Sequence, residues 1–129
     1  MNENDAMDLL RALLKSEGAE WVEEGGYLRF RSQHDAMRWE TACRACEGAL
    51  LFYGRFPFRV SDPDRARRIC EELNRRLVRG ALYLDEDGSP VCRCRAELDD
   101  VYGAQERIAA SLQYGAQVMA YAWGRLSGV

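Results

Sequence analysis

The segment spanning residues 61–97 constrains the fold most, because it predicts a helix, a strand, a tight turn and a second strand in succession. Asp62-Pro63 is a typical helix start, with a capping carboxylate followed by proline at the first helical position. Gly80 is a typical helix stop, since glycine readily adopts a left-handed conformation. Strands are expected over residues 81–84 and 91–95, joined by an acidic, glycine-containing turn. The apolar stripe of the helix comprises Ala66, Ile69, Cys70, Leu73 and Leu77.

Hydrophobic periodicity predicts two further helices and four further strands. A glycine-rich turn favours a hairpin near the N-terminus, and the third strand is favoured over a helix because the turn Glu47-Gly48 follows it. The predicted order is α-β-β-β-β-α-β-β-α, an α+β fold in which helices pack on an antiparallel sheet, within one domain over residues 1–129. The additional helices are expected at 4–16 and 104–127, and the additional strands at 21–23, 27–31, 38–46 and 50–53, the last continuing extended to residue 60.

Composition argues against several classes of partner. The 129 residues carry a net charge of −3, and the arginines are interleaved with acidic residues. Because nucleic-acid binding normally requires a basic excess, no nucleic-acid partner is expected. No apolar run approaches the roughly 20 residues that cross a bilayer, and the N-terminus lacks the pattern of a secretion signal. The odd number of cysteines favours reduced thiols. A cytoplasmic protein without membrane contact is predicted.

The spacing of Cys43 and Cys46 fits both zinc knuckles and redox pairs, and Cys92 with Cys94 could complete four thiolates. In a strand, however, residues three apart point to opposite faces, so this pair would converge only in a turn or a helix. Packed thiols are therefore the favoured interpretation. No metal or cofactor is expected, and a thiol protein using Cys43 and Cys46 for zinc or redox chemistry is the alternative.

Catalytic groups are hard to find in the sequence. His34 is the only histidine, and it lies in a polar segment that predicts an exposed turn. The densest acidic run, Asp85 to Asp87, is shorter than a calcium-binding loop and is explained by a hairpin turn. An enzyme that uses carboxylates alone stays possible, but no pattern locates it. The sequence predicts no enzyme and no catalytic residue.

One segment is more apolar than a half-exposed strand would be. Residues 50–53 are apolar at consecutive positions and are followed by Phe56-Pro57-Phe58, whereas a strand with one wet face alternates. Either both faces are covered within the chain, or one face covers a second chain. Aromatic residues near Arg55 and Arg59 are typical of protein interfaces. The expected partner or dimer surface comprises Trp39, Phe52, Phe56 and Phe58.

Four short stretches carry a family resemblance: Leu73-Asn74, residues 80–85, Asp87-Gly88 and residues 91–97. With the order of elements, they make the chain similar to the YbjN-like family of bacterial proteins, described as candidate sensory transduction regulators, and to the type III secretion chaperones that share its fold. The resemblance implies a homodimeric or partner-binding module without enzymatic activity, and a structural role for Asn74. The function predicted is therefore non-catalytic protein binding, of a chaperone-like or regulatory kind.

Overall fold

The computed structural model describes residues 2–100 and 102–129 and confirms the predicted α+β order. Asn2 caps the first helix by accepting a hydrogen bond of 2.8 Å from the Asp5 amide, and Asp62 caps the second in the same way at Arg65. The helices are α1 (Glu3–Ser16), α2 (Pro63–Asn74) and α3 (Ala104–Leu126). The strands are β1 (Trp21–Glu24), β2 (Tyr27–His34), β3 (Met37–Cys46), β4 (Ala49–Arg55), β5 (Ala81–Leu84) and β6 (Pro90–Glu97).

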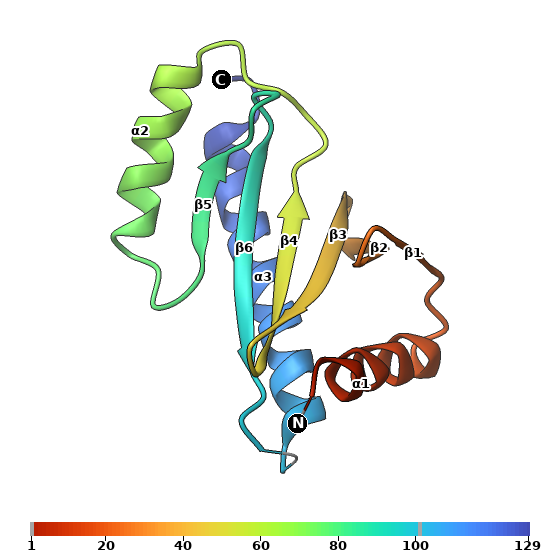
Figure 1. The fold of residues 1–129 in the computed structure, drawn as a ribbon. Coiled ribbons are helices and arrows are strands. Elements are labelled where there is room, and N and C mark those ends of the chain that lie inside the picture. The colour runs from red at the N-terminus through yellow and green to blue at the C-terminus, as the bar shows by residue number, and fades with distance from the viewer. Residues whose placement is uncertain (1, 101) are drawn as a thin grey trace.

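The six strands form one antiparallel sheet in the order β1-β2-β3-β4-β6-β5. The first four strands follow one another as hairpins, and the turn between β3 and β4 is made by Glu47 and Gly48, both with positive φ. The chain then leaves the sheet to form α2 and returns as β5 at the far edge. The last strand, β6, fills the position between β4 and β5 (Figure 1).

All three helices lie on the same side of this sheet. In Figure 1, α3 runs behind the strands, and it packs against β6, β4 and β2. Helix α1 packs against β3, β4 and α3, while α2 packs against β5 and α3. Within residues 2–100 and 102–129, none of these helices combines the length and the apolar character that crossing a bilayer requires. None of the helices formed by the described residues packs on the opposite face of the sheet.

The buried side chains between helices and sheet form two clusters. Together they provide the apolar burial that stabilises the fold. The first cluster is centred on α1 and the middle of the sheet and includes Leu10, Leu14, Leu28, Phe30, Cys43, Leu50, Phe52 and Ile108. The second lies between α2, α3 and the β5 side of the sheet and includes Trp39, Phe56, Ile69, Leu73, Leu82, Cys92, Met119 and Leu126.

The predicted helix stop at Gly80 was wrong, because α2 ends at Asn74. The Asn74 side chain leaves the helix surface and bonds to β5: its Nδ2 donates to the Leu82 carbonyl at 2.9 Å, and its Oδ1 accepts from the Leu82 amide at 2.8 Å. It thus satisfies the outer backbone groups of an edge strand. Gly80 does have the left-handed φ of 83°. A Cβ there would lie 2.9 Å from the Arg93 carbonyl oxygen, so the close approach of β5 to β6 also requires glycine.

Candidate functional site

The four aromatic residues predicted for a partner surface lie mostly inside the chain. Trp39, Phe52 and Phe56 are buried, with exposed fractions of 6%, 3% and 1%, and Phe58 is half-buried. The rings of Phe56 and Phe58 lie 5.6 Å apart, and each contacts Trp123 of α3, at 5.7 and 5.4 Å between centroids. The segment after β4 is therefore covered by this chain's own helix. A partner could reach Phe58 without a change in the fold.

Strand β4, which is apolar on both faces, contributes residues to both sides of the sheet. Leu50 and Phe52 point toward the helices and are buried, whereas Leu51 and Tyr53 point to the open face and are half-buried. In the register of the sheet, Leu51 lies between two arginines, Arg44 of β3 and Arg95 of β6. Tyr53 likewise lies beside Arg93 of β6. We define the open face by Tyr27, Arg29, Ala42, Arg44, Leu51, Tyr53, Tyr83, Arg93 and Arg95.

Contacts among these side chains order the centre of the open face. The rings of Tyr27 and Tyr53 meet edge to face, with their centroids 6.4 Å apart. The Arg44 guanidinium donates from Nε to the Tyr53 hydroxyl oxygen at 3.3 Å, and this bond raises the pKa of Arg44. The Arg29 guanidinium lies 5.5 Å above the Tyr27 ring. The centre is therefore an aromatic and aliphatic surface bordered by cations.

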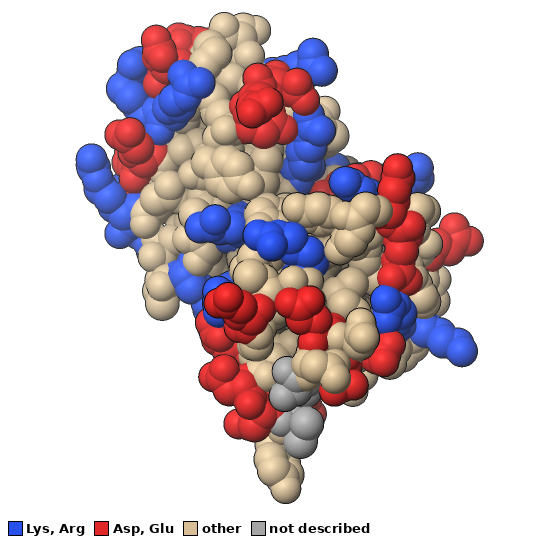
Figure 2. All heavy atoms as spheres, viewed as in Figure 1, with Lys and Arg blue, Asp and Glu red and all other residues tan. Residues whose placement is uncertain are grey.

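The arginines of this region differ in whether an acidic residue pairs with them. Arg29 pairs with Glu40, and Arg95 pairs with Glu97. In the part of the chain that the structure describes, Arg44, Arg79 and Arg93 lie in no ion pair. Figure 2 shows arginine atoms across the middle of this face, uncharged surface around them, and acidic residues gathered toward the lower end. The middle of the face therefore favours a negatively charged ligand.

Strand β6 has an open backbone edge next to this face. The pairing of β5 with β6 ends at Ala81 opposite Arg93, although β6 continues to Glu97. The carbonyl of Pro90 and the amide of Leu98 bond toward β4. Because backbone groups alternate along an antiparallel strand, those of Arg95 point to the opposite side, where β5 has ended. This edge offers a donor and an acceptor to an added strand.

A hollow of about 660 Å³ lies along the same edge. Its walls include Leu51, Arg79, Arg93 and Arg95, with Arg107 of α3 at one end. The Arg107 guanidinium donates to three backbone carbonyls, that of Glu97 at the end of β6 and those of Asp100 and Tyr102 in the following loop, at 2.6–3.0 Å. Arg107 thus fixes one wall of the hollow. The Arg79 guanidinium lies 5.2 Å from the Tyr114 ring centroid of α3, and among the described residues neither Arg79 nor Arg93 pairs with an acidic side chain that would compete with a ligand.

The thiols and the histidine do not converge. Cys43 is fully buried on the helix side, and Cys46, three residues on, is half-buried and points to the open face. Cys92 and Cys94 lie together in the core, with their sulfur atoms 4.0 Å apart. His34 ends β2, and its Nε2 lies 3.7 Å from the Asp35 carboxylate. Among the described residues, no group of three His, Cys, Asp or Glu side chains could hold a metal ion.

Thiol reactivity should follow burial. Burial raises the pKa of Cys43 to about 12, and the hydrogen bond that Cys92 shares with Cys94, together with burial, raises the pKa of Cys92. Because the thiolate is the reactive form, we expect a disulfide reagent such as Ellman's reagent to label Cys46 of the native protein at pH 8 and to spare Cys43. Labelling of Cys43 should become fast only above its raised pKa or after unfolding. Mass spectrometry of tryptic peptides reads both sites, and equal labelling of the two in folded protein would contradict the burial of Cys43.

No protein-family model and no curated protein matches this sequence. A solved structure does match: YbjN from E. coli, described as a candidate transcription regulator, has a TM-score of 0.70 over 92% of each chain. The chain has the YbjN fold. Sequence identity to YbjN is 16%, so the likeness concerns the fold, and it confirms at that level the resemblance carried by the helix end, the glycine-marked strand and the acidic turn. The YbjN-like fold extends over nearly the whole chain.

Proposed function

We propose that this chain, as a single YbjN-like domain over residues 1–129, is a non-catalytic module that binds a partner protein, in a chaperone-like or regulatory role. One observation carries the proposal: on the sheet face that no helix of the described residues covers, the central apolar residues Leu51 and Tyr53 lie beside arginines of β3 and β6. Tyrosine and arginine with apolar neighbours are the composition enriched at protein interfaces. The partner surface then lies on the open face, with Phe58 at its margin.

The partner segment we propose is extended and alternates acidic with apolar side chains. Its acidic groups would pair with Arg79 and Arg93, which pair with no acidic side chain among the described residues, and its apolar groups, on the opposite side of the added strand, would point toward the helix side of the hollow at Ala110 of α3. Its backbone would add to the open edge of β6 at Arg95. Two copies of this chain would bring arginine against arginine if they met through this face, so charge complementarity favours a different protein there.

A defined peptide tests this proposal. The probe is a fluorescein-labelled eight-residue peptide that alternates glutamate with valine, and its control is the same peptide with lysine in place of glutamate. Fluorescence anisotropy should show binding of the acidic peptide only, weakening as salt rises. The double variant Arg79→Glu with Arg93→Glu should weaken binding by about tenfold or more, because two attractive charges become repulsive. Arg68→Glu, an exposed arginine on α2, is the matched control.

Two results would contradict the proposal. One is acidic-peptide binding that the double reversal leaves unchanged. The other is tighter binding of a duplex DNA oligonucleotide than of the acidic peptide by the wild-type protein. The homodimer expected from the sequence remains part of the proposal, and light scattering of the same samples under reducing conditions measures it. A dimer that persists in the double variant would place self-association on a surface other than this face.

A further inference from the structure

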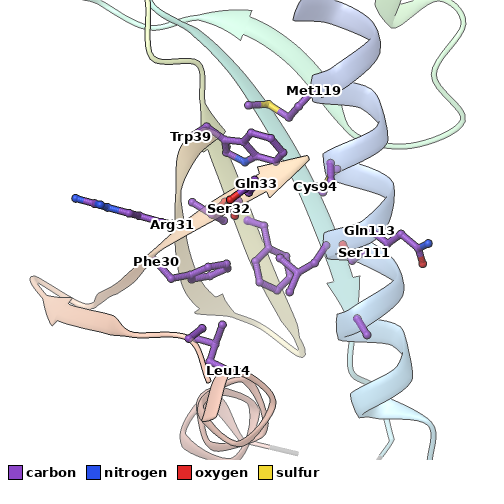
Figure 3. Close-up of a pocket in the computed structure, with 18 of the residues that line it drawn as sticks. Leu14, Phe30, Arg31, Ser32, Gln33, Trp39, Cys94, Ser111, Gln113 and Met119 are labelled. Atoms are coloured by element: carbon purple, nitrogen blue, oxygen red, sulfur yellow. The ribbon is translucent and has the colours of Figure 1, made fainter. Parts of the chain in front are cut away.

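A cavity of about 460 Å³, partly open to solvent, lies on the face of the sheet opposite to the proposed partner surface. It lies between β2, β3, β4 and β6 on one side and α3 on the other, with the end of α1 below it (Figure 3). Its walls draw on both core clusters, with Leu14, Phe30 and Phe52 from one and Trp39 and Met119 from the other. A concave volume of this size, lined mainly by apolar side chains, is typical of small-molecule sites.

Among the described residues, the cavity wall contains a buried hydroxyl group that has no hydrogen-bond partner. Ser111 of α3 is 3% exposed, and among the described residues its hydroxyl oxygen is a buried polar atom without a hydrogen-bond partner. The hydroxyl of a serine inside a helix commonly donates to a backbone carbonyl of the preceding turn. The Ser111 hydroxyl lacks such a bond and lines the cavity, so a bound molecule could provide its hydrogen-bond partner. Leaving such a group unpaired costs about 1–3 kcal/mol. The other hydroxyls of the wall, Ser32 and Thr41, bond to each other at 2.7 Å.

The charges around the cavity limit what it can hold. The charged residues of the wall, Glu17 and Arg31, are both exposed. In Figure 3 the side chains of Arg31 and Gln113 point away from the cavity, whereas Phe30, Trp39 and Leu14 point into it. A charged ligand would therefore be buried without a counter-ion, which is strongly unfavourable.

We propose that this cavity is a binding site for a small, uncharged, mainly apolar molecule that carries one hydrogen-bonding group directed at the Ser111 hydroxyl. The apolar walls would provide the affinity, and Ser111 would fix the orientation. The site is independent of the proposed partner surface, because the sheet separates the two.

N-phenyl-1-naphthylamine is a suitable probe, because it is uncharged, apolar and has a single N–H donor. We expect saturable binding of one molecule per chain, with enhanced probe fluorescence and quenching of Trp39. Ser111→Ala should weaken binding about tenfold, the effect of one lost hydrogen bond. Ala116→Leu should abolish binding by placing a larger side chain in the wall, whereas Ala110→Leu, on the other side of α3, should leave binding unchanged.

Circular dichroism shows whether each variant folds. If Ala116→Leu does not fold, the affinity of Ser111→Ala for the probe still tests the site. The proposal is overturned if the folded wild-type protein shows no saturable binding. It is also overturned if folded Ala116→Leu binds the probe as tightly as wild type, since the probe would then lie elsewhere. Equal affinity of wild type and Ser111→Ala would remove Ser111 as the orienting group.

Discussion

Phe56→Ala should lower the free energy of unfolding by about 3–5 kcal/mol, the range found when a large core aromatic is truncated. Phe56 is 1% exposed, and its ring packs against both Phe58 and Trp123, which also contact each other, in the cluster that joins the end of β4 to α3. Removing the ring leaves a void that this segment fills only in part, because the Phe56 amide is fixed by its hydrogen bond to the Pro90 carbonyl. Urea unfolding followed by circular dichroism measures the loss.

Arg59→Ala is the control for this prediction, since Arg59 lies in the same segment and is exposed. We expect its effect on stability to stay within about 0.5 kcal/mol. A loss below about 1 kcal/mol for Phe56→Ala would mean that the ring contributes little to the core. Phe56 would then return to the partner surface that the sequence predicted, and binding to a partner would become its more important role.

Asn74→Ala should destabilise the protein by about 2–3 kcal/mol, because it leaves both the amide and the carbonyl of Leu82 without their bonds. Water can replace these bonds only in part, as Leu82 itself is buried beside α2. The substitution should also loosen β5, which is an edge strand of the sheet formed by the described residues. Hydrogen exchange at the Leu82 amide should therefore accelerate more than exchange in β3, and chemical denaturation gives the change in stability.

Glu71→Ala, one turn earlier on α2 and exposed, separates this effect from a general change in the helix. Its cost should be a few tenths of a kcal/mol, the scale of helix propensity differences. Similar losses for the two variants would mean that the Asn74 bonds to β5 contribute nothing beyond helix stability.

The locally encoded features were predictable from the sequence. Pro63 after Asp62 marks a helix start because capping depends on adjacent residues only, and the alternation of Trp39, Thr41 and Cys43 predicts one buried face of a strand. The end of α2 was not predictable in the same way. Leu77 continues the apolar stripe, so periodicity extends the helix, whereas the structure ends it where Asn74 bonds to Leu82, a residue eight positions further on.

The candidate site on the open face was likewise predictable only in part from the sequence. Arg93 and Arg95 alternate with buried cysteines, and Leu51 alternates with buried neighbours, so the sequence contains both halves of the open face. Leu51 lies beside these arginines only because β6 occupies the position between β4 and β5 in the sheet.

The order of helices and strands, and the two faces of each strand, follow from the sequence because periodicity and capping involve residues only a few positions apart. Three other features depend on packing between distant segments. These are the face of the sheet that the helices cover, the open edge of β6, and the cavity between the two core clusters at Ser111. Those features arise only when all three helices pack on the same face of the sheet, because the contacts that define them join residues far apart in the sequence.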